Sequence, residues 1–214
     1  MHSTTAMRDA WQQLLARLGA APATATRTFQ RLHACYSAPE RAYHNLAHIR
    51  HVLDVVTSLA DECDQPDTVR LAAWLHDIVY VPDAAGNESR SAALAATWLG
   101  RAGLEAATCA EVTRLILLTA GHDPQPGDAN GAVLVDADLA ILGAAPPDYD
   151  AYARAIRLEY AHLPDDVYRT GRAGVLLRFL NRPAVYRTAP LRAGHEAQAR
   201  RNLARELSAI AAKE

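Results

Sequence analysis

Residues 66–82 read PDTVRLAAWLHDIVYVP, and this stretch decides the predicted fold class. Its apolar residues almost encircle a helix, which is typical of a helix at the centre of a hydrophobic core. We therefore predict a central helix that begins at Pro66 and continues through Val79. His76 and Asp77 would lie within it. An ionised carboxylate beside an imidazole is costly in such surroundings unless it is paired or bound to a metal.

Apolar residues recur at helical spacing on both sides of this stretch, whereas the alternating pattern of a β-strand is hard to find. The sequence therefore predicts an all-α protein with a single domain over residues 1–214. A loop is predicted over residues 124–131, before a short helix in VLVDADLAILG that Asp136 or Asp138 would cap. The other predicted helices cover residues 11–18, 22–36, 46–59, 88–99, 105–119, 148–162, 164–180 and 191–212.

The composition indicates an ordinary globular chain. Of the 214 residues, 50% are hydrophobic and 21% are charged, and the formal net charge is -2. This balance offers no extended basic track for DNA or RNA, and no apolar run reaches the roughly 18 residues of a membrane span. Cys35, Cys63 and Cys109 stand far apart, so neither disulfides nor a cysteine zinc site is expected. Because the N-terminal residues lack the apolar run of a signal peptide, we expect a cytoplasmic protein.

A row of histidines precedes the central stretch. On a helix, residues four and seven apart share a face, so His44, His48 and His51 would project together if the helix reaches back to His44. Such an array is typical of ligands. A divalent cation would also remove the cost of burying His76 beside Asp77, because it replaces their lost hydration and lowers the pKa of a bound water toward neutrality.

Four strings extend this interpretation: YHNLAHI at 43–49, LAAWLHDIVY at 71–80, NESRSA at 87–92 and DADLAILG at 136–143. The HD superfamily of metal-dependent phosphohydrolases carries an H…HD…D signature, and the sequence resembles it in the order of His48, His76, Asp77 and Asp138. The resemblance covers nearly the whole chain and implies one all-α HD-type domain, with a metal-binding core over about residues 40–142 and helical extensions at both ends. It also implies that the four signature residues bind a divalent metal. Two imidazoles and two carboxylates suit Mn²⁺, Fe²⁺, Co²⁺, Ni²⁺ or Zn²⁺, or more weakly Mg²⁺.

The resemblance also suggests roles for neighbouring acidic residues. In the family's D-x-D-L arrangement the second aspartate binds the metal, so Asp136 is expected to cap a helix or to accept a hydrogen bond near the ligands. Glu88 resembles the acidic residue that serves as general base or proton shuttle beside the metal-bound water, although negative charge in the first turn also stabilises a helix. Asp77 and Glu88 are therefore the predicted catalytic residues.

Three further histidines lie near these strings. His51 is predicted to orient a ligand through a hydrogen bond. His44 is predicted either to do the same or to contact a substrate phosphate or a second metal. His122 follows a helix that ends in LLTAGHD, and relatives with two metals supply extra histidines between the HD pair and the final aspartate. His44 and His122 are thus the candidates for a second metal site.

The resemblance implies a phosphohydrolase that cleaves a phosphoester of a small nucleotide or a related phosphorylated metabolite with a metal-activated water. Arg41, Arg157 and Arg172 are candidates for holding the remaining phosphate oxygens, although each could equally be a surface salt-bridge residue. Tyr43 and Tyr160 are candidates for stacking on a base or sugar, although buried core tyrosines are more common. The expected partner is this small substrate, without nucleic acid or membrane.

Two other functions stay open. An HD-fold di-iron oxygenase would use His44 or His122 as an additional ligand, and two irons per chain with oxygen consumption would identify it. A non-catalytic nucleotide-binding regulatory module would bind a nucleotide tightly without consuming it. The sequence identifies neither the substrate nor the oligomeric state.

Overall fold

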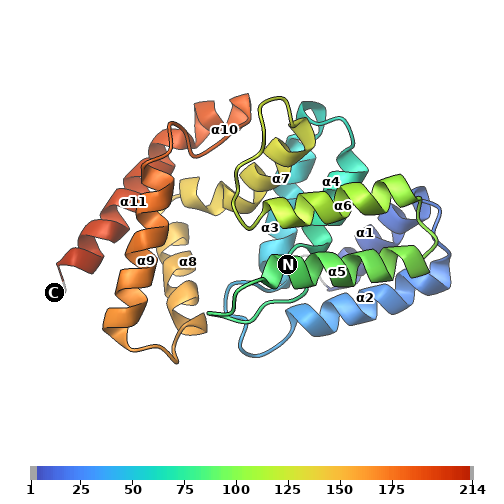
Figure 1. The fold of residues 1–214 in the computed structure, drawn as a ribbon, viewed down its shortest axis with the longest axis horizontal. Helices are drawn as coiled ribbons and strands as arrows, with labels where there is room; N and C mark the ends of the chain where they lie inside the picture. The colour runs from blue at the N-terminus through green and yellow to red at the C-terminus, as the bar shows by residue number, and fades with distance from the viewer. Residues whose placement is uncertain (1–3, 213–214) are drawn as a thin grey trace.

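The computed structural model describes residues 4–212, and within this range the chain forms helices and no strand (Figure 1). The predicted all-α fold is confirmed. The elements are α1 (Thr4–Arg17), α2 (Pro22–Tyr36), α3 (Leu46–Ser58), η1 (Ala60–Glu62), α4 (Pro66–Leu75), α5 (Asn87–Arg101), α6 (Ala106–Leu118), α7 (Ala129–Leu139), η2 (Ala140–Gly143), α8 (Pro146–Glu159), α9 (Asp165–Leu180), α10 (Ala189–Gly194) and α11 (Glu196–Ala211).

Local sequence signals set many of the helix ends. Proline occupies the first turn of α2, α4, α8 and α10, where its missing N–H needs no partner. The Asn45 side chain caps α3 by accepting the N–H of Ala47 at 2.8 Å. After α1, Gly19 takes a φ of +84°, a left-handed conformation that glycine adopts without strain.

Helices α3, α4 and α7 contact one another and form the centre of the fold, which we call the central helices. α6 packs on both α4 and α7, and α5 lies beside α6 (Figure 1). Trp74 of α4 is buried against Trp11 of α1, with ring centroids 5.5 Å apart. Apart from Arg70, every residue from Val69 to Leu75 is buried, as predicted for a helix at the centre of the core.

Helices α8, α9, α10 and α11 form a second part along one side of the central helices (Figure 1), which we call the C-terminal layer (residues 146–212). α11 packs on α9 and on η2, and α8 also contacts η2. The Tyr186 hydroxyl donates to the carbonyl of Leu139 at 3.2 Å, and the Asn202 side chain donates to the carbonyls of Leu142 and Ala144 at 2.9 Å each. One hydrophobic core runs through both parts.

The central helix α4 ends at Leu75, so the predicted continuation through Val79 is wrong. The Arg41 guanidinium donates to the carbonyl of Asp77 at 2.7 Å, and the Ser91 hydroxyl pairs with both the N–H and the C=O of Val79 at 3.1 and 3.2 Å. These side chains replace the backbone partners that a longer helix would supply, so the chain can leave the helix. Asp77 therefore lies in the turn that follows α4.

Helix α7 also begins earlier than predicted. Asp128 caps it by accepting the N–H of Gly131 at 2.9 Å, so the predicted loop ends before residue 129. Asp136 and Asp138 lie in the last turns of α7, and the prediction that one of them caps its start is wrong.

The predicted helix over residues 191–212 is in fact two helices, which meet at His195. The Glu196 carboxylate opens α11 and accepts the N–H groups of Val185 and Tyr186 at 3.0–3.2 Å. These hydrogen bonds turn the preceding chain back onto the start of α11. Within residues 4–212 no single helix has the length and apolarity to cross a membrane, and only the bent pair Ala129–Gly143 and Pro146–Glu159 has them when taken together.

Candidate metal centre

Three side chains from different helices converge at the centre of the fold. His48 comes from α3, His76 from the residue that caps the end of α4, and Asp138 from the last turn of α7. The two Nε2 atoms lie 3.3 Å apart, and Asp138 Oδ1 lies 3.3 Å from that of His48 and 3.5 Å from that of His76. Each residue thus offers one ligand atom within 4.8 Å of the others, and this group could hold a metal ion.

Two more side chains adjoin this group. Asp77 Oδ2 lies 3.2 Å from His76 Nε2 and 3.7 Å from His48 Nε2. His122 Nε2 lies 2.8 Å from Asp138 Oδ2, the carboxylate oxygen that faces away from the other histidines. We call these five residues the His/Asp cluster: His48, His76, Asp77, His122 and Asp138.

The end of α4 at Leu75 explains how His76 and Asp77 face the same point. Successive residues of an α-helix point about 100° apart, so two neighbours inside a helix diverge. Because Asp77 lies beyond the helix end, its carboxylate can turn back toward the His76 ring. Burying the pair inside a regular helix, as the sequence suggests, would not bring their side chains together.

His76 is oriented as a metal ligand requires. Its Nδ1 lies 2.9 Å from the carbonyl of Ala73, so Nδ1 carries a proton and Nε2 is the nitrogen that faces the cluster. By contrast, the buried Nδ1 atoms of His48 and His122 have no hydrogen-bond partner among residues 4–212. The donor set of imidazole nitrogens and carboxylate oxygens fits a divalent transition metal.

The electrostatics of the cluster also favour a cation. His48 and His76 are only 4% and 1% exposed. Burial lowers the pKa of His48, whereas the carboxylates of Asp77 and Asp138 outweigh burial and raise the pKa of His76 well above its usual value. The two aspartates in turn have pKa values well below the usual range, because the attraction of His76 overcomes the effect of burial. Two carboxylates against one imidazolium leave these four residues with net negative charge.

Asp136 and Asp138 lie two residues apart on α7 and therefore point in nearly opposite directions. Asp138 reaches the histidines, whereas Asp136 is fully buried against the C-terminal layer. Its carboxylate accepts the N–H groups of Arg187 and Thr188 and the hydroxyl of Thr188 at 2.7–3.0 Å. Burial raises the pKa of Asp136 despite these hydrogen bonds. Asp136 therefore anchors the layer rather than the cluster.

His44 lies beside the cluster but outside helix α3, which begins at Leu46. Its Nδ1 lies 2.6 Å from Glu159 Oε2, and its ring stacks on Tyr80 with centroids 4.0 Å apart. Glu159 also accepts the N–H groups of Tyr43 and His44 at 2.7 and 2.9 Å. Burial raises the pKa of Glu159, but these hydrogen bonds outweigh burial and lower it. Glu159 thus holds the backbone of the two residues before the N-cap of α3.

Helix α3 begins at Leu46 and does not reach back to His44, so the condition under which His44, His48 and His51 would share one helix face is not met. His51 lies one helical turn after His48 and is exposed. Among residues 4–212 no hydrogen bond joins His51 to the cluster. Glu88 lies in the first turn of α5, as predicted, and is half-buried, and the described residues include no hydrogen bond between it and the cluster.

The three arginines singled out from the sequence are engaged by the protein itself. Arg41 is buried and donates to backbone carbonyls, including that of Asp77. Arg157 donates to two carbonyls and to Asp165 at 2.6 Å. Arg172 is buried and pairs with both oxygens of Glu206 at 2.8 and 3.0 Å. All three stabilise loops or helix contacts.

An arginine that sequence reasoning missed holds His122 in place. His122 takes a φ of +50°, a left-handed conformation that costs a non-glycine residue on the order of 1–2 kcal/mol. Arg182, which follows α9, donates to the carbonyl of His122 at 2.7 Å and to that of Gly121 at 2.6 Å. These two hydrogen bonds from the C-terminal layer fix the loop conformation in which His122 reaches Asp138.

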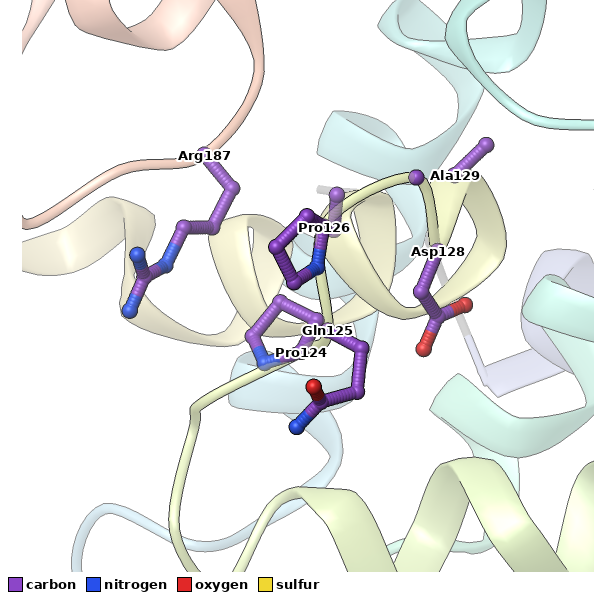
Figure 2. Close-up of a pocket in the computed structure, with 8 residues that line it drawn as sticks. Pro124, Gln125, Pro126, Asp128, Ala129 and Arg187 are labelled. Atoms are coloured by element: carbon purple, nitrogen blue, oxygen red, sulfur yellow. The ribbon is translucent and has the colours of Figure 1, made fainter.

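A hollow of about 280 Å³ lies beside the loop after His122, between residues 124–129, Ala132 and Arg187. Figure 2 shows Pro124 and Pro126 between Arg187 and Asp128. Both charged groups are paired, Arg187 with Asp123 at 2.7 Å and Asp128 with Arg114 at 2.7 Å. No residue of the His/Asp cluster lines this hollow.

Comparison of the chain with protein-family models, with curated proteins and with solved structures gives no match. The candidate site therefore rests on the residues and geometry described above.

Proposed function

We propose that the chain is a metal-dependent phosphohydrolase of the HD superfamily. His48, His76, Asp77 and Asp138 would bind one divalent cation, of the series Mn²⁺, Fe²⁺, Co²⁺, Ni²⁺, Zn²⁺ or Mg²⁺. One observation carries the proposal: two imidazoles and two carboxylates from three separate segments lie within hydrogen-bonding or ion-pair distance in buried surroundings. The order of these residues along the chain supports the same family. The substrate class is a small phosphorylated molecule rather than a nucleic acid.

The protein's own groups account for most of what such a reaction needs. When bound, the cation would lower the pKa of a water and neutralise charge on a phosphate oxygen. His76 keeps its proton at Nδ1 through the carbonyl of Ala73 and presents Nε2. Glu88 is proposed as the proton acceptor, because it precedes Ser91 by three residues and shares its helix face. Ser91 hydrogen-bonds to the backbone of Val79, two residues after Asp77, so this face of α5 is turned toward the segment that carries Asp77.

The test compares two histidines near the same part of the fold, His76→Ala in the cluster and His51→Ala on the exposed side of α3. Metal-loaded wild-type protein is expected to release phosphate from a phosphoester, assayed over a panel of nucleotides and sugar phosphates with each metal. His76→Ala should lower this rate by at least about 100-fold, because even outer partners of metal ligands contribute about 10- to 100-fold. His51→Ala should behave as wild type.

Failure to release phosphate from any compound with any of the six metals would contradict the proposal, as would an unchanged rate in His76→Ala.

One contact favours a second candidate, a di-iron oxygenase. His122 Nε2 lies 2.8 Å from Asp138 Oδ2, so a further imidazole is available beside the first group of ligands. This alternative predicts two irons per chain and oxygen consumption by the iron-loaded protein. One Mn²⁺, Zn²⁺ or Mg²⁺ per chain without redox activity would exclude it.

A further inference from the structure

A cavity of about 440 Å³ lies between α8, α9 and the turn that carries Tyr80. Its volume is within the range of about 300–1,000 Å³ that is typical of small-molecule sites. Aromatic and aliphatic side chains form most of its walls, and the aromatic ones are Tyr80, Tyr152, Tyr160, Tyr168 and the imidazole of His44. Such walls suit a flat ring, since stacking on an aromatic face is open to any aromatic group.

The cavity adjoins the His/Asp cluster. His44 lines the cavity, and its ring centroid lies 5.7 Å from that of His48. Tyr152 also lines it. The ring centroids of Tyr152 and Tyr43 lie 4.7 Å apart, and those of Tyr43 and His48 lie 4.8 Å apart. The cavity therefore adjoins the proposed metal ligand His48 through the rings of His44 and Tyr43.

The two basic side chains that line the cavity, Arg172 and His44, are paired before any ligand enters. Arg172, which is buried, forms a two-point pair with Glu206, and His44 pairs with Glu159. The Tyr80 hydroxyl donates to Glu159 at 3.0 Å. Asp83 also lines the cavity, with its Oδ2 4.0 Å from His162 Nε2, and its carboxylate would repel phosphate. The cavity thus lacks a free cation for a chain of phosphates but offers rings and apolar side chains.

We propose that this cavity binds an uncharged aromatic group, of the kind of a nucleobase, that belongs to a phosphoester with a single phosphate. The inference rests on the proposed function and narrows its substrate class: aromatic monophosphates such as nucleoside monophosphates are preferred to sugar phosphates and to nucleoside triphosphates. Tyr160, a candidate for base stacking in the sequence, lies on the cavity wall.

Helix α9 provides a matched pair of variants. Gly171 lines the cavity and Gly174 does not, and an added side-chain carbon at either position would meet no atom within 4 Å. Gly171→Leu is expected to fill the cavity without disturbing the fold, and Gly174→Leu is its control. Both should keep the helical circular dichroism of wild type, because leucine favours a helix more than glycine does.

The experiment measures kcat/KM of the metal-loaded protein for the four nucleoside 5′-monophosphates, a nucleoside triphosphate and ribose 5-phosphate. The best monophosphate should exceed ribose 5-phosphate by at least about tenfold, through KM. Gly171→Leu should abolish that preference by raising KM for the best monophosphate to the value for ribose 5-phosphate, while all rates of Gly174→Leu stay unchanged. Equal KM values for the nucleotides and ribose 5-phosphate would overturn the inference and leave the phosphohydrolase intact.

Calorimetric titration with the four free nucleosides separates the two proposals. If no compound is hydrolysed but a nucleoside binds to wild type and Gly174→Leu and not to Gly171→Leu, the phosphohydrolase fails and the aromatic site stands. Absence of nucleoside binding to wild type, together with unselective hydrolysis, would overturn the aromatic site.

Discussion

The central helices and the C-terminal layer contribute to the candidate site in different ways. The central helices, the turn after α4 and the turn after α6 carry every ligand-type atom of the His/Asp cluster. The C-terminal layer carries none of them, yet it holds the backbone from which they project. Glu159 binds the N–H groups before α3, and Arg182 binds the carbonyls at Gly121 and His122. One part supplies the chemistry and the other fixes its geometry.

This difference explains which residues a sequence can reveal. A histidine and an aspartate within an apolar stretch are conspicuous, because their burial demands a partner. A charged residue that binds a distant backbone looks like any residue on a solvated helix. The contrast between the two parts can be tested by substitutions on each side of their junction.

The largest effect is expected from the two aspartates of α7, which serve different parts. Asp138→Asn should lower the affinity for Mn²⁺ or Zn²⁺ by at least about 100-fold, because it removes the negative charge of a carboxylate whose two oxygens face three histidines. Asp136→Asn should leave that affinity nearly unchanged. It should instead lower the free energy of unfolding by about 1–3 kcal/mol, since an amide cannot accept all the hydrogen bonds from residues 187 and 188.

Metal titration and urea unfolding of the metal-free proteins measure the two quantities. The separation of roles would be contradicted if Asp136→Asn lost the metal as strongly as Asp138→Asn. The separation of roles would also be contradicted if Asp136→Asn and Asp138→Asn had the same metal affinity and the same urea midpoint of unfolding.

The fold was largely predictable because its helices carry their own signals. Val69 to Leu75 is apolar on almost every side, and prolines mark several helix starts. The end of α4 was not predictable, because Arg41 and Ser91 set it from distant positions in the chain. The apolar residues after His76 continue the helical pattern in the sequence. Only the tertiary contacts of Arg41 and Ser91 end the helix before them.

The site was predictable in part for a similar reason. The sequence strings around His48, His76 and Asp138 place unusual side chains among apolar ones, whereas the role of Glu159 was missed. A signal for it existed: Tyr149, Ile156 and Glu159 fall on one face of α8 and are all buried, so the glutamate interrupts an apolar stripe. Arg182 follows a helix end and has no periodic pattern around it, and nothing in the local sequence indicates its contacts.

A smaller effect is expected from Arg182→Ala. The variant loses the two hydrogen bonds that hold residues 121 and 122, so the left-handed conformation of His122 should no longer be fixed. If His122 supports the ligands through Asp138, metal affinity should fall by about 10- to 100-fold. Titration of the apoprotein with Zn²⁺ measures it. Arg178→Ala is the control, because Arg178 stacks on the same Phe179 ring as Arg182.

Arg178 donates no hydrogen bond to this loop within the described part of the chain, so its removal should leave the Zn²⁺ affinity at the wild-type value. Equal losses in the two variants would mean that the arginines act through general positive charge. The C-terminal layer would then have no specific part in placing His122.

The smallest loss of stability is expected from an ion-pair network that lies outside the junction between the central helices and the C-terminal layer. Arg114 of α6 binds Glu111 at 2.8 Å and Asp128 at 2.7 Å, and its side chain is 46% exposed. Hydrogen bonds from Arg114 lower the pKa of both carboxyls below their ordinary values. Because exposed ion pairs contribute little, Arg114→Met should lower the free energy of unfolding by less than about 1 kcal/mol at pH 7.

The pH dependence gives this prediction its sign. A carboxyl whose pKa is depressed in the folded state adds stability above its unfolded pKa, which is about 3.9 for aspartate and 4.3 for glutamate. That stability is lost as the pH falls through the folded-state pKa. The difference between wild type and Arg114→Met in urea unfolding should therefore be constant from about pH 5 to 7 and shrink below about pH 4. A difference that persists at pH 3 would show that Arg114 acts through the packing of its aliphatic stem.

The loss in free energy of unfolding at pH 7 should also be smaller for Arg114→Met than for Asp136→Asn. Equal losses would show that burial does not determine how much a charged group contributes to stability in this fold. The contrast between the buried junction and the exposed surface would then be lost.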